Sequence, residues 1–367
     1  MRNSFGGSDS VRDLLRVEGI VTLDSPEWIQ EFIASGRSIR LIRGVPRGRV
    51  EVPHLDFVRV GGLAVGHAEA ADASSGVTVV LFESAAPTVV EVRGGASATY
   101  DTASLSLDAT FGRRWALFFA GGSLFGLDAA RGVRLRVLEQ GGGHRAFRNP
   151  NPVAPVSGAA LFDLPSKTGP IPDYLPLGYE AARTASRSDV AVGRVGAGAG
   201  ATVGKYLGRD RAMRGGVGAA AARLGSLGTI GVLLVVNAVG AVRDPRTGRW
   251  VAGARDPRGG VAPPTDRLGR RDATTGTTLG VVVTDLAVER TALARIVAMA
   301  HAGLAAAVSP FHSATDGDVL FGASTGTLRK PHREKRVGEI ADRLGVAAGR
   351  LAVEAALGAV RAANAEP

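Results

Sequence analysis

The stretch "DATTGTTLGVVVTD", residues 272–285, joins a threonine-rich turn to an apolar run. The run from Leu279 to Val283 has the length and the β-branched content of a buried strand. Gly276 interrupts the threonines directly before that strand, so a residue without a side chain precedes the hydroxyl of Thr277. A glycine leaves the carbonyl group before Thr277 open to approach by that hydroxyl.

This junction has the residue types of a self-cleavage site. A threonine hydroxyl is a weak nucleophile unless a base takes its proton. If the peptide bond between Gly276 and Thr277 is cut, the new α-amine of Thr277 lies beside the hydroxyl, with an ordinary pKa of about 7.7–8.0. The amine can then serve as that base. An ordinary turn before a strand is the alternative that the residue types alone leave open.

The composition excludes several other kinds of chemistry. The 367 residues contain no cysteine, so disulfides, thiolate metal sites and a cysteine nucleophile are ruled out. The net charge of +10 invites a nucleic-acid interpretation, but the charges are spread along the chain and only 5% of the residues are aromatic. The six histidines stand singly, without the spacing of a metal site. We therefore expect no nucleic-acid partner, no metal and no cofactor.

The N-terminal residues and the longest apolar run lead us to expect a cytoplasmic protein that does not contact a membrane. The N-terminal residues lack the pattern of a signal peptide. The longest apolar run, residues 227–242, is short for a membrane span and contains Asn237. A polar amide at the end of a buried strand must find hydrogen-bond partners or face a ligand, and both interpretations of Asn237 stay open at this point.

The layout predicts an N-terminal extension, residues 1–56, followed by one domain, residues 57–367. Strand-like runs come as neighbours at 76–82 and 87–95, and again around 227–237 and 279–285. A helix is expected after the last of these strands, because Leu293, Ile296, Val297, Ala300 and Leu304 recur at helical spacing. A second helix should follow from 337 to 363, and residues 243–275 read as a long surface loop. Grouped strands and separate helices favour sheets packed on each other and covered by helices.

Two motif matches fail on their details. "GAGAGATVGKY", residues 196–206, has Ala199 and Tyr206 where a phosphate-binding loop needs glycine and a hydroxyl residue, so we expect a packed turn that binds no nucleotide. "GASTG", residues 322–326, has the spacing of a nucleophile elbow, but no long helix is predicted after Ser324. Asp316 and Asp318, in "DGD" before a strand, read as a turn when taken alone.

Several stretches in order carry a family resemblance: "GGSLFGLDAARGV", "GAGAGATVGKYLG", "RGGVGAAAARLG", "VVNAVGAVRDPRTG", "TTLGVVVTD" and "DGDVLFGASTG". Through them the chain resembles the self-processing aminopeptidases of the DmpA family, also called the L-aminopeptidase/D-esterase or β-aminopeptidase family. The resemblance implies an α+β fold, an αββα sandwich of two stacked sheets covered by helices. That architecture is similar to the N-terminal-nucleophile hydrolases, with a different chain connectivity.

The resemblance also assigns site residues. Self-cleavage is expected between Gly276 and Thr277, giving fragments 1–276 and 277–367 with Thr277 as the nucleophile. Thr278 is the nearest alternative position for the nucleophile, and Thr275 is a poorer one. The family's oxyanion asparagine falls on Asn237, and its polar pair falls on Asp316 and Asp318. The expected substrates are small peptides, amino-acid amides or esters, and we expect a homo-oligomer.

The chain departs from the family pattern at three places. Residues 1–56 are an extension, "SPFHSAT" precedes Asp316 where relatives read closer to "HTPF", and a tyrosine used by some relatives has only Tyr174 and Tyr179 as nearby candidates. Three alternatives stay open. One is an acyltransferase of the ornithine-acetyltransferase type, and another is an uncleaved, inactive relative with a binding role. The third is nucleic-acid binding through the excess of arginine, which would show a steep salt dependence.

Overall fold

The structure, a computed structural model, describes residues 55–72, 74–145, 150–164, 170–264, 275–328 and 337–365. All of them belong to the compact unit Val52–Pro367. The expected extension, residues 1–56, lies outside the described residues except for its last two positions. Among the described residues, no helix combines the length and apolar character needed to cross a bilayer.

Nine strands form the centre of the fold, in the order β3-β5-β4-β2-β16-β14-β9-β8 with β1 beside β2. Their bounds are β1 (Leu63–Glu69), β2 (Gly76–Val92), β3 (Ala98–Tyr100), β4 (Arg113–Ala120), β5 (Val156–Ala160), β8 (Gly216–Arg223), β9 (Thr229–Asn237), β14 (Thr277–Leu286) and β16 (Val319–Leu328). Strand β2 belongs to both halves of this sheet. Its first part pairs with β1 and β4, and its last part pairs with β16. The strands therefore form two stacked layers joined through β2.

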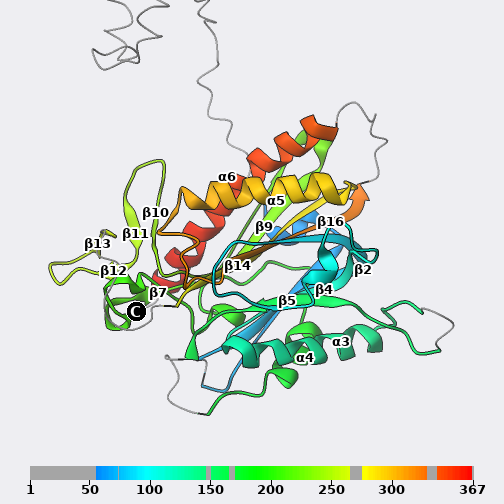
Figure 1. Ribbon diagram of the computed structural model, residues 1–367, viewed down its shortest axis with the longest axis horizontal. Coiled ribbons are helices and arrows are strands. Elements are labelled where there is room, and N and C mark those ends of the chain that lie inside the picture. The colour runs from blue at the N-terminus through cyan, green and yellow to red at the C-terminus, as the bar shows by residue number, and fades with distance from the viewer. Residues whose placement is uncertain are drawn as a thin grey trace, which may run out of the picture. The chain divides into compact units, whose positions relative to one another are not determined.

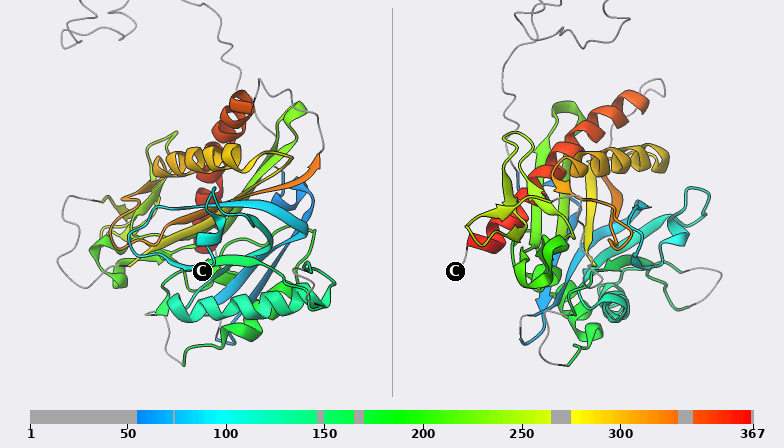
Figure 2. Two further views of the ribbon diagram at one scale, coloured as in Figure 1. Left: turned by 45° about the vertical axis from the view of Figure 1, so that its right-hand side comes forward. Right: turned by 60° about the vertical axis from the view of Figure 1, so that its left-hand side comes forward.

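Helices cover the two outer faces (Figures 1 and 2). Helices α5 (Arg290–Ala305) and α6 (Val337–Ala365) lie on the layer of β8, β9, β14 and β16. Helices α3 (Ala129–Glu139) and α4 (Tyr174–Arg183) lie on the layer of β2, β4 and β5. The order of layers is helix, sheet, sheet, helix, so the predicted αββα sandwich is confirmed.

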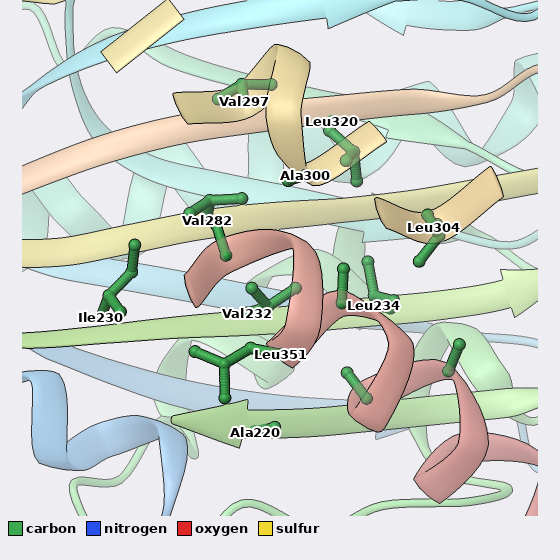
Figure 3. Packing of buried hydrophobic residues seen from close by; sticks show 14 of the residues in the cluster. Ala220, Ile230, Val232, Leu234, Val282, Val297, Ala300, Leu304, Leu320 and Leu351 are labelled. Atoms are coloured by element: carbon green, nitrogen blue, oxygen red, sulfur yellow. The ribbon is translucent and has the colours of Figure 1, made fainter. Parts of the chain in front are cut away.

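Strand β14 is buried on both faces, as its apolar run predicts. Leu279, Val281 and Val283 point between the two sheets. Val282 points the other way, into the cluster that β9 and β14 form with helices α5 and α6 (Figure 3). Burying a side chain of this size contributes about 1.5–3 kcal/mol. Each end of β14 is therefore held rigidly within the sheet.

The expected loop at 243–275 is wrong in part, because its first half forms short strands. These are β10 (Ala241–Arg243), β11 (Trp250–Ala252), β12 (Ala254–Arg255) and β13 (Val261–Ala262), while β10 also pairs with β15 (Val308–Ser309). Such short strands, separated by Gly and Pro, leave no periodic signal in the sequence. Residues 265–274 lie outside the described part of the chain.

The glycine-rich stretch 196–206 forms closely packed turns. It contains the 3-10 turn Gly196–Gly198, strand β6 (Thr202–Val203), which pairs with β7 (Met213–Arg214), and the start of the turn Lys205–Leu207. Gly204 has a φ of 80°, and a Cβ there would come within 1.9 Å of the Gly253 carbonyl carbon. Further 3-10 turns are Phe57–Val60, Ala103–Leu105, Ser123–Asp128, Arg209–Arg211 and Gly225–Leu227.

Candidate active site

Strand pairing brings the predicted site residues together. Thr277, the first residue of β14, lies opposite Asn237, the last residue of β9. Gly276 forms a parallel bridge with Asp316, just before β16, and Asp318 directly precedes that strand. Because β9 and β16 flank β14 on its two sides, three segments that are distant in sequence meet at one end of the sheet.

The carbonyl group of Gly276 accepts two hydrogen bonds. The N–H of Gly317 donates to it at 2.9 Å, and the hydroxyl of Thr277 also donates to it. The N–H of Gly276 donates to the carbonyl of Thr315 at 3.2 Å, which fixes the peptide on the other side. A Cβ on Gly276 would lie 2.3 Å from the nitrogen of Val239. Close packing therefore requires glycine here, in addition to the open approach that the sequence suggested.

Asp318 organises the start of β14. Its side chain is fully buried, and Oδ1 accepts the N–H of Thr278 at 2.6 Å. Oδ2 accepts the N–H of His312 at 3.0 Å and lies 3.0 Å from Nδ1 of the same histidine. The carboxylate thus contacts the backbone one residue after Thr277, and His312 holds it there. The departure "SPFHSAT" places His312 in this contact, which the sequence reasoning missed.

Asp316 ties the loop before β16 to the end of β9. Its Oδ1 accepts the N–H of Val239 at 3.1 Å, and its Oδ2 accepts the hydroxyl of Ser313 at 2.6 Å. Burial, followed by the negative charge of Asp318, raises the pKa of Asp316. The "DGD" segment is therefore a buried carboxylate pair on either side of Gly317, and not only a turn.

Asn237 is buried, and both ends of its side-chain amide have partners. Its Oδ1 accepts the N–H of Thr202 and the ammonium of Lys205, each at 2.9 Å. Its Nδ2 donates to the carbonyl of Phe162 at 3.2 Å. An amide nitrogen carries two hydrogens, so one bond to Phe162 leaves a second donor at the position opposite Thr277.

Lys205 is a site residue that the sequence reasoning missed. Its side chain is fully buried, and Nζ donates to the backbone carbonyls of Asn237 at 2.7 Å and Thr202 at 2.9 Å, besides the Asn237 side chain. Burial, followed by the positive charge of Arg209, lowers the pKa of Lys205 to about 7. The sequence contained a signal for this residue. Lys205 is a lone lysine among small residues in a chain with few lysines, and a buried ammonium needs hydrogen-bond partners.

The two candidate tyrosines and the serine of the nucleophile-elbow match lie elsewhere in the fold. Tyr174 is buried against Ser75, with their hydroxyl oxygens 2.6 Å apart, and Tyr179 donates to Glu139 at the surface. The Ser324 hydroxyl donates to the Leu286 carbonyl from within β16, and more strand follows it rather than the helix of a nucleophile elbow. A pocket of about 810 Å³ lies past the far end of β14, away from the Gly276–Thr277 junction.

Comparisons with known proteins agree on one family. The family model described as peptidase family S58 matches residues 57–366. An uncharacterised aminopeptidase of Mycobacterium tuberculosis is 38% identical over 292 residues, which cover 74% of this chain and 82% of the relative. The 6-aminohexanoate-oligomer endohydrolase of Paenarthrobacter ureafaciens is 30% identical over 285 residues, covering 74% and 75% of the two chains.

Two solved structures share the fold. The L-aminopeptidase D-Ala-esterase/amidase of Ochrobactrum anthropi, described as a variant of the Ntn hydrolase fold, superposes with a TM-score of 0.59 at 17% identity, covering 84% of this chain and 86% of its own. The β-aminopeptidase of a Burkholderia species superposes with a TM-score of 0.57 at 19% identity, covering 83% and 85%.

Proposed function

Because the chain belongs to peptidase family S58 and is a hydrolase of the aminopeptidase kind, we propose that it cuts itself between Gly276 and Thr277. Thr277 then hydrolyses amide or ester bonds of small substrates. The observation that supports this most directly is the hydrogen bond from the Thr277 hydroxyl to the Gly276 carbonyl, on the bond to be broken. The same carbonyl accepts the N–H of Gly317 at 2.9 Å, which is where an oxyanion needs a donor.

Self-cleavage proceeds in two steps. The Thr277 hydroxyl oxygen attacks the carbonyl carbon of Gly276, the C–N bond breaks, and the nitrogen takes up the proton that the hydroxyl loses. The product is an ester between Gly276 and the Thr277 side chain. Water hydrolyses that ester and leaves a carboxylate on Gly276 and a free amine on Thr277. The Gly317 N–H stabilises the oxyanion, a contribution of about 3 kcal/mol for one donor.

Turnover repeats this chemistry on a substrate. The free amine of Thr277 takes the proton of its own hydroxyl, and the hydroxyl oxygen attacks the substrate carbonyl. The second Nδ2 hydrogen of Asn237 stabilises the oxyanion, while Lys205 fixes the amide through its Oδ1. Loss of the leaving group gives an acyl-enzyme, which water hydrolyses. Asp318 orients the start of β14, although a nearby carboxylate also favours the protonated, inactive amine.

The substrates we propose are small peptides, amino-acid amides and esters, acted on by a cytoplasmic homo-oligomer. The name of one relative, a 6-aminohexanoate-oligomer endohydrolase, is compatible with this range. The acyltransferase alternative uses the same acyl-enzyme and differs only in what accepts the acyl group. The inactive alternative predicts an uncut chain.

Turnover of an aminoacyl p-nitroanilide by three proteins tests the proposal. The wild type should hydrolyse it, Thr277→Ala should show no activity, and Thr277→Ser should retain part of it, because the hydroxyl and the amine survive. Adding hydroxylamine or an amine acceptor separates hydrolysis from transfer: an acyltransferase gives mainly the acylated acceptor. Wild-type rates in Thr277→Ala would contradict the proposed nucleophile.

A further inference from the structure

Arg209 lies beside the cleavage junction with a guanidinium group that has only neutral partners among the described residues. It stands at the start of the 3-10 turn Arg209–Arg211, with its guanidinium carbon 5.2 Å from the centre of the Phe162 ring. Its Nη2 donates to the hydroxyl of Thr275 at 3.0 Å. The side chain is half-buried, and burial lowers the pKa of Arg209.

Within the described part of the chain, no carboxylate lies within 4.0 Å of this guanidinium. The two candidate catalytic carboxylates are bound to other groups. Asp316 bonds Val239 and Ser313, and Asp318 bonds Thr278 and His312. Within the described residues, this half-buried guanidinium meets a ring face and a hydroxyl, and such a group is a ready partner for an anion.

The position of Arg209 indicates which part of a substrate it faces. In self-cleavage the first acyl group carried by Thr277 is the segment ending in Thr275 and Gly276, and Arg209 holds Thr275. Phe162, which lies under the guanidinium, also accepts the amide of Asn237 through its carbonyl. Arg209 therefore borders the space for the acyl part of a substrate, on the Asn237 side of the nucleophile.

We propose that Arg209 binds a carboxylate on the acyl part of the substrate. The preferred substrates are then amides whose acyl part carries a free carboxylate besides its amine, as in an amino-dicarboxylic acid linked through its side-chain carboxyl. This inference rests on the proposed function, since it concerns the substrate class of the same site. Arg209 is a specificity-determining residue that takes no part in breaking the bond.

γ-Glutamyl and 4-aminobutyryl p-nitroanilides test this, because both acyl groups carry an amine on the same carbon and differ only in the carboxylate. The wild type should favour the γ-glutamyl compound in kcat/KM. Arg209→Gln should lose roughly 10–100-fold on the γ-glutamyl compound, the range expected for a charged hydrogen bond, and change little on the 4-aminobutyryl compound. On the compound that carries the carboxylate, Arg209→Lys should have a kcat/KM between those of the wild type and Arg209→Gln. The control Arg211→Gln, whose guanidinium bonds the Arg255 carbonyl, should leave both rates unchanged.

Self-cleavage is scored on a gel for every variant, because Thr275 is also a partner of Arg209. If Arg209→Gln stays uncut, inhibition of the wild type decides: glutamate should inhibit more strongly than 4-aminobutyrate. Equal losses on both anilides, or equal inhibition by both acids, would overturn the inference. A wild type that hydrolyses aminoacyl amides without a carboxylate preference sinks this inference alone. A wild type that neither cuts itself nor hydrolyses any amide sinks the proposed function and this inference with it.

Discussion

The hydroxyl of Thr277 donates a hydrogen bond to the carbonyl of Gly276, its own neighbour in the chain. The uncut chain thus holds the nucleophile against the bond that we propose it breaks. Strand pairing on both sides of β14 fixes this geometry, with Asn237 opposite Thr277 and Asp316 beside Gly276. Thr277 is only 3% exposed in the uncut chain.

Gly317 should be essential for self-cleavage. A Cβ at this position would lie 2.9 Å from the Thr277 hydroxyl oxygen and 2.9 Å from the Ala96 carbonyl, so Gly317→Ala should displace the hydroxyl or the donor of the oxyanion. We expect cleavage to slow by at least ~10-fold, as for loss of an oxyanion donor. A time course on a gel measures it. The control Gly358→Ala adds a methyl group where no atom lies within 4 Å and should cleave normally; equal rates in both variants would refute the role.

Asn237→Ala should lower turnover by roughly a hundredfold or more, because it removes a donor to the oxyanion. Steady-state kinetics on an aminoacyl p-nitroanilide measures the loss, and circular dichroism checks that the protein is folded. Asn364→Ala is the matched control, since that amide bonds the backbone of Arg214 and the Val360 carbonyl within α6. An unfolded Asn237→Ala protein, with no separable loss of turnover, would favour a structural role.

The pH dependence should report the free amine of Thr277. Only the neutral amine is a base, so kcat/KM should rise with pH through an apparent pKa of about 8 or somewhat below. Burial lowers an amine pKa and a nearby carboxylate raises it. Asp318→Asn should therefore reduce activity and move the midpoint to lower pH. A midpoint that stays in place would mean that the Asp318 charge does not act on the amine.

Lys205 should make folding stability depend on pH. Burial lowers its pKa to about 7, from an unfolded value of 10.5, so between these values the unfolded chain binds more protons than the folded one. The destabilising contribution is fully present below pH 7 and disappears as the pH rises to 10.5. Urea unfolding in a Thr277→Ala background should show the wild-type lysine gaining stability relative to Lys205→Met from pH 7 to pH 10. A constant difference would show that the lysine stays charged in the folded protein over this range, so that burial does not lower its pKa.

The sequence predicted the elements that carry strong periodic signals. The apolar runs of β9 and β14 and the helical spacing of Leu293, Ile296 and Leu304 all lie where expected. The family resemblance, rather than periodicity, supplied the two-layer stacking and brought Asn237, Asp316 and Thr277 together. Lys205 and His312 were missed for a physical reason. The role of each depends on which groups surround it after folding. Comparing residues 196–206 with a phosphate-binding loop considers only residue spacing, so it could not reveal the buried contacts of Lys205.

The intact mass of the purified chain, followed by N-terminal sequencing, tests the central claim most directly. The wild type should give two polypeptides whose masses sum to the 37.6 kDa chain plus one water, and the smaller should begin Thr-Thr-Leu-Gly. Thr277→Ala should remain one polypeptide of the full length. A wild type that stays uncut, or a small fragment that begins at Thr278, would contradict Thr277 as the nucleophile released by cleavage at Gly276.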